Sequence, residues 1–238
     1  MTATNTLYTR LLRANDPIAE LTEIGELSVA VDDLEVTNYD SDVGYREYLP
    51  GMVDGGELEI TGNLYGDDAQ ESLRSDYESG DLQNFIFAFP NSLDSSWSFQ
   101  AYVKNYSMSQ PMDGLVKFTA TMKITGKPTL VTDNGSAGLT TPYFTLSGNN
   151  SGSISPTPSP SGTVYLYSAT AGNLDTAVTV TPTADTGTLH VNGTSTTSGS
   201  GVSVSLGAAG TTTRAYIVAK ESNKSPKIYK INITRAEA

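Results

Sequence analysis

Short segments in which apolar and polar residues alternate run along almost the whole chain. Between residues 115 and 126 (LVKFTATMKITG), apolar side chains occupy every second position, with lysines and threonines between them. A period of two places each set of side chains on one face of a β-strand, so the pattern predicts half-buried strands. This pattern, or a short apolar run, also predicts strands at residues 25–31, 34–38, 56–62, 84–90 and 97–106, and later at 163–169, 177–184, 187–193, 202–207, 213–221 and 227–235.

One segment, residues 67–81, instead predicts a helix of about three turns. Its apolar residues recur at every fourth position: Ala69, Leu73 and Tyr77. Asp67 is suited to cap the start, with Gln70 three residues later, and Gly80 is placed to end the helix. We expect the acidic remainder to face solvent while the apolar stripe packs on a sheet. The predicted fold class is therefore all-β with one short helix.

The charge divides the chain into two parts. Residues 1–130 hold 21 acidic and 8 basic residues, whereas residues 131–238 hold 5 acidic and 6 basic residues, which together give the net charge of -12. The composition changes at the same place, because residues 131–163 are rich in Ser, Gly, Thr, Asn and Pro. A Ser/Gly/Pro-rich stretch at a change in surface charge predicts a linker between two domains.

Several classes of function are excluded or disfavoured. The chain has no Cys and one His, His190, so thiol catalysis and metal sites with several imidazole ligands within one chain are excluded. We predict a structural or surface role for His190 and no catalytic, cofactor-binding or metal-ligating residues. The strong negative charge opposes adhesion to nucleic acid or anionic lipid. No apolar run is long enough for a membrane helix or a signal peptide, so we expect synthesis in a cytoplasm and no membrane insertion.

One polar, Gly-rich and Tyr-rich stretch of about 17 residues interrupts the strand pattern near residues 39–56. Loops of this length are uncommon unless they are functional. Its aromatic and charged side chains suit a protein–protein contact. They are Tyr39, Tyr45, Arg46, Glu47 and Tyr48. A mobile hairpin tip is the alternative interpretation.

The same stretch carries a family resemblance. The segments YREYLPGMVDGGELEITG (45–62) and FTATMKITGKP (118–128), with a short acidic helix, FIFAFPN and a W-x-F strand between them, resemble the major tail tube proteins of long-tailed, non-contractile phages (siphophages). The resemblance implies two packed antiparallel sheets with a flanking helix and a long hairpin loop, in a virion protein assembled in the host cytoplasm. It also implies hexameric rings stacked into a tube, with the tape-measure protein and transiting DNA in the lumen and tail tip and tail terminator proteins as partners. In this setting the five residues above are candidates for the contact between rings.

The second part of the chain resembles the cadherin-like, immunoglobulin-type β-sandwiches appended to bacterial and phage surface proteins. Residues 145–169 look like the opening of such a domain, and KIYKINITR (227–235) looks like its last strand. The resemblance moves the start of the domain to about residue 140. The predicted organisation is thus a tail tube domain at 1–131, a hinge at 132–139 and an outer domain at 140–238 that decorates the tube.

Six subunits that each gave four strands would form a barrel of 24 strands, with a backbone diameter of roughly 48 Å. Polar residues that alternate with core residues on its strands are candidates for the lumen: Glu57, Glu59, Lys117 and Lys123. A negatively charged wall would repel DNA phosphates and allow sliding. Three alternatives stay open at this stage: a tube protein of a contractile tail or secretion system, a surface-binding adhesin module, and a glycosidase, for which no cleft signature is visible.

Overall fold

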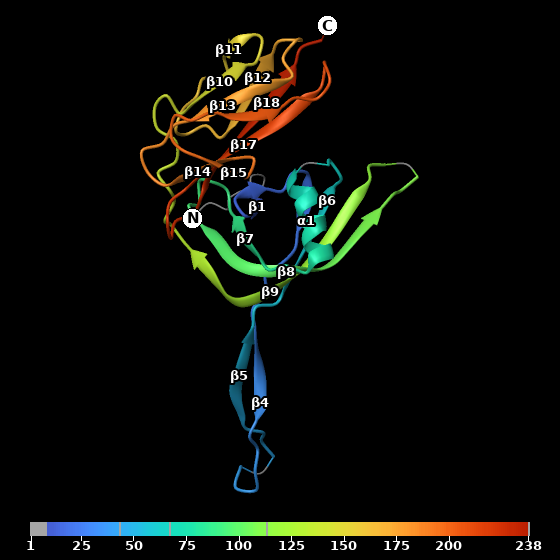
Figure 1. Cartoon of the computed structure of the whole chain (residues 1–238). Coiled ribbons are helices and arrows are strands. Elements are labelled where there is room, and N and C mark those ends of the chain that lie inside the picture. The colour runs from blue at the N-terminus through green and yellow to red at the C-terminus, as the bar shows by residue number, and fades with distance from the viewer. Residues whose placement is uncertain (1–8, 43, 67, 113, 238) are drawn as a thin grey trace. The chain divides into compact units, whose positions relative to one another are not determined.

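The computed structural model describes residues 9–42, 44–66, 68–112 and 114–237. The chain divides into two compact units. The first unit comprises residues 1–18, 86–97 and 130–238, and the second comprises residues 19–85 and 98–129. Among the described residues, strands dominate both units and one helix lies in the second, as the alternating sequence pattern predicts (Figure 1).

The N-terminal half builds a seven-stranded sheet in the order β2-β1-β7-β8-β9-β6-β3. The strands are β1 (Arg10–Arg13), β2 (Asp16–Pro17), β3 (Leu21–Ile24), β6 (Glu57–Asn63), β7 (Gln83–Ala88), β8 (Ser96–Ser109) and β9 (Lys117–Val131). Alternation places the apolar residues of β6 and β9 on one face, where they are buried: Leu58, Ile60, Phe118, Ala120 and Met122. The predicted strands at 56–62, 84–90, 97–106 and 115–126 are therefore confirmed.

The helix α1 spans Asp68–Ser79, close to the predicted range. Ala69 and Leu73 are buried, as predicted, but Tyr77 is 44% exposed, so the predicted stripe is one residue too long. The Tyr77 ring instead stacks on Tyr106 of β8, with centroids 6.4 Å apart. The expected N-cap, Asp67, lies outside the described residues.

Gln70 anchors the start of the helix. Its buried amide accepts hydrogen bonds from the N–H groups of Tyr65 and Gly66 at 2.9 and 3.1 Å, and donates to the carbonyl oxygens of Ala19 and Asn63 at 2.9 and 3.1 Å. The side chain thereby satisfies backbone groups of the loop that enters the helix, a role different from the capping box predicted for it.

Two further strands, β4 (Ala30–Glu35) and β5 (Tyr48–Asp54), pair only with each other. This hairpin differs from the sequence prediction in two ways. The predicted strands at 25–31 and 34–38 are replaced by one strand whose residues are all exposed, and part of the predicted loop at 39–56 is a strand. Pro50 and Gly51 are residues typical of loops, so the sequence pattern does not indicate that β5 is a strand. Pro is tolerated here because each strand of an isolated pair has a free edge.

The C-terminal part is a sandwich of two sheets, in the orders β11-β10-β13-β16 and β12-β18-β17-β14-β15. The strands are β10 (Phe144–Gly148), β11 (Gly152–Ile154), β12 (Leu166–Ala171), β13 (Ala177–Pro182), β14 (Thr188–Val191), β15 (Thr194–Thr196), β16 (Val202–Ser205), β17 (Thr212–Lys220) and β18 (Lys227–Arg235). Inward residues of both sheets form one core around Phe144, Tyr167 and Tyr229. Composition alone predicts a linker at 131–163, but β10 and β11 lie there, because Ser and Thr fill the outward positions of those strands.

The segment predicted as a hinge, 132–139, is hydrogen-bonded along its length within the first unit. Asn134 N–H donates to the Asp94 carbonyl oxygen at 3.0 Å, and Ser136 N–H donates to the Ser225 carbonyl oxygen at 2.8 Å. Leu139 N–H donates to the Tyr229 hydroxyl at 3.0 Å.

Candidate functional site

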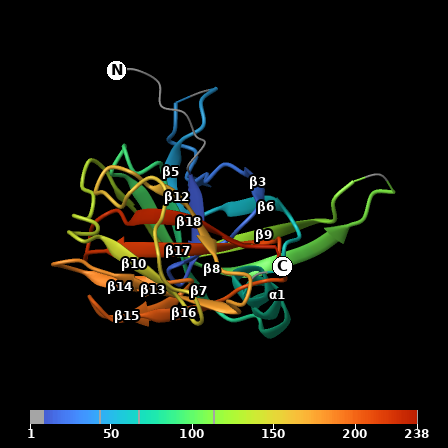
Figure 2. The same cartoon turned by 90° about the horizontal axis from the view of Figure 1, so that it is seen from above.

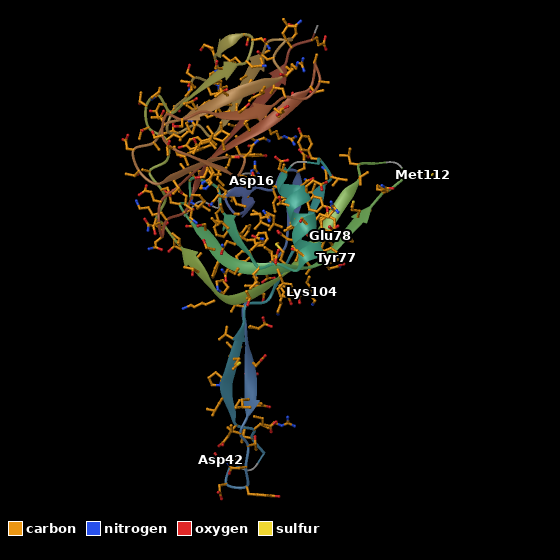
Figure 3. All side chains as sticks on the ribbon, in the orientation of Figure 1. Asp16, Asp42, Tyr77, Glu78, Lys104 and Met112 are labelled. Carbon is orange, nitrogen blue, oxygen red and sulfur yellow. The ribbon has the colours of Figure 1, made fainter. Side chains whose placement is uncertain are left out.

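The β4–β5 hairpin of the second unit carries several exposed apolar side chains. Both strands are exposed at every position, and Met52, Val53 and Leu34 are 86%, 64% and 58% exposed. Figure 1 shows the hairpin projecting from the sheet of its own unit, and Figure 3 shows Asp42 at its far end. A two-stranded hairpin is marginally stable in water, and contiguous exposed apolar groups mark interaction surfaces. The hairpin is therefore a candidate interaction surface.

The pairing of the hairpin places apolar side chains on both of its faces. Val31 pairs with Val53, and Leu34 pairs with Leu49. Val31 and Leu34 are three residues apart on one strand, so their side chains point to opposite faces. The two pairs are three residues apart on β4 but four residues apart on β5. An irregularity in register between Val31 and Asp33 accommodates the extra residue of β5, so the residues of each pair remain opposite each other. Each face of the hairpin thus offers one apolar pair.

Half of the net negative charge of the chain lies on the hairpin. Residues 30–54 contain seven acidic residues and one basic residue, Arg46, for a net of -6 against -12 for the whole chain. The Arg46 guanidinium lies 3.6 Å from the Glu35 carboxylate, and both groups are exposed. A partner surface for the hairpin must therefore supply cationic or hydrogen-bond-donating groups beside its apolar contacts.

All five residues predicted for a ring–ring contact lie on this hairpin. Tyr39 and Tyr45 are exposed at its tip, and Tyr48 opens β5 opposite Glu35. The Glu47 carboxylate accepts a hydrogen bond from the Ser41 hydroxyl at 2.9 Å. The structure thus brings the five together, but sequence reasoning missed the apolar pairs along the stem, because exposed strands with Pro and Gly do not alternate clearly.

The root of the hairpin is fixed by Gly56, whose φ of +79° is a left-handed conformation that favours glycine. A Cβ at this position would lie 1.9 Å from the Ser28 carbonyl oxygen. The Gly56 N–H donates to the Asp54 carboxylate at 2.9 Å, and the Gly56 carbonyl oxygen accepts from Ile124 N–H at 3.1 Å. These contacts determine the direction in which the hairpin leaves the sheet.

The four candidates for the lumen share one face of the sheet, opposite the core. Glu57 stands directly across from Lys123, Glu59 across from Thr121, and Lys117 across from Asn63. Their neighbours along each strand are buried, so alternation turns all four away from the core.

Two ion pairs offset part of the acidic charge at this polar face. Lys104 of β8 lies 2.6 Å from Glu57, and Lys123 lies 2.7 Å from Asp54. The hydrogen bond from Lys123 lowers the pKa of the Asp54 carboxyl, and the same bond raises the pKa of the Lys123 ammonium. Of the charged residues here, Glu57 is thus paired with Lys104, and Lys123 with Asp54 at the end of β5. Sequence reasoning omitted Asp54 and Lys104, although the alternation of residues 97–106 places Lys104 on this face.

A second hairpin is formed by the far ends of β8 and β9. Figures 1 and 2 both show it reaching past the rest of the sheet, and Figure 3 places Met112 at its tip. Met108, Met112 and Leu115 are exposed there. The sequence pattern does not identify this hairpin as a feature, because apolar residues that occur singly give no periodic signal.

His190 lies on β14 of the C-terminal sandwich, opposite Val218 of β17. Burial and the nearby Lys220 ammonium lower the pKa of the imidazole, and its Nδ1 atom is buried without a hydrogen-bond partner. Within the described ranges, no three His, Asp or Glu side chains are grouped so that they could hold a metal ion. No helix in that part of the chain is long and apolar enough to cross a membrane.

Comparison with known proteins gives two family matches. Residues 2–131 match the model of the lambda phage tail tube protein, and residues 153–236 match the cadherin-like β-sandwich domain. A search of the curated proteins found no match.

The solved structures that this chain matches include chains from several tube assemblies. A chain in the tail of an empty gene transfer agent particle is 17% identical, with 54% of this chain and 99% of that chain covered and a TM-score of 0.47. The SPP1 tail tube protein is 16% identical, with coverages of 52% and 77% and a TM-score of 0.42. A chain of an extracellular contractile injection system, in its extended sheath–tube complex, is 11% identical, with coverages of 55% and 92% and a TM-score of 0.45. At these identities and scores the assignment rests on the first family match, which spans more than half of the sequence. The chain belongs to the lambda phage tail tube protein family and carries a cadherin-like β-sandwich domain at its C-terminal end.

Proposed function

We propose that this tail tube protein forms hexameric rings that stack into the tube of a phage tail through the β4–β5 hairpin. The observation that carries the proposal is the hairpin itself, which is exposed at every position and presents an apolar pair on each face. Because each face carries an apolar pair, the hairpin is suited to lie between two surfaces rather than on one. Tyr39, Tyr45, Arg46, Glu47 and Tyr48 then contact the next ring at the tip.

The polar face of β6, β8 and β9 is proposed to line the lumen, with Glu57, Glu59, Lys117 and Lys123 exposed to the tape-measure protein during assembly and to DNA during ejection. A lumen wall that bound DNA phosphates tightly would slow the passage of DNA through the tube. Lys104 and Lys123 are paired with carboxylates, which leaves these two lysines less able to bind DNA phosphates. This pairing supports the sliding of DNA through the lumen, in a different way from the repulsion by an acidic wall that composition predicts. Each of these two lysines is neutralised by a neighbour before DNA arrives.

The remaining assignments follow the family resemblance. Residues 1–131 form the tube domain, residues 132–139 join it to the outer domain, and residues 140–238 decorate the outside of the tube. Assembly takes place in the host cytoplasm, and tail tip and tail terminator proteins close the two ends of the tube. Among the described residues, the core cluster of the C-terminal sandwich is formed by side chains between positions 139 and 233, which supports a separate outer domain.

The test replaces Leu34 and Leu49 together with serine. Each leucine buried between rings contributes about 1.5–3 kcal/mol, so the concentration needed for polymerisation should rise at least tenfold. Leu34 and Leu49 are exposed in the free subunit, so the thermal stability of the subunit should change little in this variant. Electron microscopy and sedimentation measure the tubes, and circular dichroism measures the fold.

Leu174→Ser is the matched control, because Leu174 is 71% exposed but lies in the C-terminal sandwich. This variant should form tubes at the concentration of the unmodified protein. Unchanged polymerisation of the Leu34/Leu49 variant would remove the hairpin from the contact between rings.

A further inference from the structure

The first unit contains a cavity that the proposed tube function does not use. This cavity, which we name the Arg10 pocket, has a volume of about 690 Å³ and is lined by Arg10 of β1, residues 90–92, residues 163–166, and Ile228 and Lys230 of β18. All of these residues belong to the first unit. Pockets that bind small molecules usually have volumes of roughly 300–1,000 Å³. The Arg10 pocket is therefore large enough for a small organic ligand.

One wall of the pocket, residues 90–92, is fixed to the start of β18 by hydrogen bonds. The Asn91 side-chain amide donates to the Ile228 carbonyl oxygen at 2.8 Å and accepts from the Ile228 N–H at 3.1 Å. The Lys227 ammonium donates to the Asn91 carbonyl oxygen at 2.6 Å. These contacts hold the wall in place through both the backbone and the side chain of Asn91.

The opposite wall, residues 163–166, is also held by the fold. The Tyr167 hydroxyl donates to the Val164 carbonyl oxygen at 2.7 Å, and the Lys230 N–H donates to the Tyr165 carbonyl oxygen at 2.8 Å. The Tyr165 ring lies beside the buried Tyr229 ring, with centroids 5.2 Å apart. A site whose walls are already ordered loses little conformational entropy when a ligand binds.

The charge of the pocket is opposite to that of the chain. Arg10 and Lys230 are basic, and none of the described lining residues is acidic, although the whole chain carries a net charge of -12. The Arg10 guanidinium donates to the Thr9 carbonyl oxygen at 3.1 Å, and its planar fork of N–H donors matches the geometry of a carboxylate. The neighbouring Lys227 is instead paired with Asp94. The pocket thus favours an anionic group.

The rest of the lining is largely apolar. Its apolar residues come from both walls and from β18: Pro90, Val164, Tyr165, Leu166 and Ile228. Mostly apolar walls with a few polar groups that fix orientation are typical of small-molecule sites, and a tyrosine ring packs well against another flat ring. The lining therefore suits a ligand that carries its anionic group on a ring.

We propose that the Arg10 pocket binds a small carboxylic acid that contains a ring. The carboxylate is held by Arg10 and Lys230, and the ring lies against Tyr165 and Leu166. This site goes beyond the proposed function, since all of its lining residues come from one subunit and it needs no contact between copies. An aromatic acid and an acidic sugar share this chemistry, and the experiment distinguishes them.

Isothermal titration calorimetry on the unmodified protein compares two acids with their neutral counterparts. The probes are 2-naphthoate against 2-naphthamide, and digalacturonate against galactobiose. At least one acid should bind about tenfold more tightly than its neutral counterpart, because the charged hydrogen bonds to Arg10 are lost in the neutral compound. The acid that binds identifies the kind of ring. In amide NMR spectra, the shifts that this acid causes should be centred on residues 90–92, 163–166 and 228–230.

Two variants test the pocket by different means. Arg10→Gln removes the charge, and Ser92→Trp fills the pocket from an exposed position without changing the charge. Each should weaken binding of the acid by about tenfold or more. Lys127→Gln is the matched control, since Lys127 is exposed and does not line the pocket, and its affinity should equal that of the unmodified protein. Circular dichroism checks that each variant is folded.

Three results would overturn the proposal. They are no binding of either acid at millimolar concentration, equal binding of acid and neutral counterpart, and an affinity that neither Arg10→Gln nor Ser92→Trp changes. Because these measurements need only the free subunit, each of the three results leaves the proposed tube function in place. Failure of the unmodified protein to form tubes would in turn leave the Arg10 pocket in place.

Discussion

Asp175 connects two turns of the C-terminal sandwich through hydrogen bonds of its side chain. Its buried carboxylate accepts hydrogen bonds from the N–H groups of Asn150, Ser151 and Gly172 at 2.6, 2.9 and 2.8 Å, and from the Ser151 hydroxyl. It thereby ties the turn after β10 to the turn after β12. Burial alone would raise the pKa of this carboxyl, but the hydrogen bonds outweigh burial and lower the pKa to about 2.

The low pKa of Asp175 predicts a pH dependence of stability. A carboxyl with a folded pKa of about 2 and an unfolded pKa near 3.8 stabilises the fold above pH 4, and this contribution is lost as the pH falls toward 2. Asp175→Asn should lower the free energy of unfolding by about 2 kcal/mol at pH 7, and the difference from the unmodified protein should shrink below pH 4. Chemical denaturation at several pH values measures it. Asp185→Asn, at an exposed carboxylate of the same domain, should change stability by less than about 0.5 kcal/mol. A loss that is equal at pH 7 and pH 2.5 would contradict this account.

At the scale of elements, the direction of the β4–β5 hairpin depends on its root. Gly56→Ala should disrupt the root, because the left-handed conformation costs about 1 kcal/mol and the new methyl group would overlap the Ser28 carbonyl oxygen. We expect the free energy of unfolding to fall by about 2 kcal/mol or more and tubes to disappear. Gly199→Ala is the matched control, since Gly199 of the C-terminal sandwich has a φ of +78° and a methyl group added there would meet no neighbouring atom within 4 Å. Normal tubes from Gly56→Ala would show that hairpin direction is not needed for assembly.

The elements also show which parts of the fold could be predicted from sequence. Strands with one buried face, such as β6 and β9, are predictable because burial forces Leu58, Ile60 and Met122 onto alternate positions. The β4–β5 hairpin is not, because neither of its faces is buried in the subunit and no period is imposed on it. The aromatic tip of the hairpin nevertheless stands out in the sequence, since five polar and aromatic residues in a long gap between strands have no role in a core. Ion-pair partners such as Lys104 and Asp54 could not be assigned, because pairing across strands depends on register.

For the whole molecule, the central claim is that six copies close into a ring and that rings stack through the hairpin. Cryo-electron microscopy of the unmodified, purified protein at rising concentration tests it most directly. The account predicts tubes of six-fold rings in which the β4–β5 hairpin of each subunit lies against the neighbouring ring and the face with Glu57 and Glu59 borders the channel. Tubes in which the hairpin points into solvent, or a protein that stays monomeric at concentrations where related tubes assemble, would contradict it.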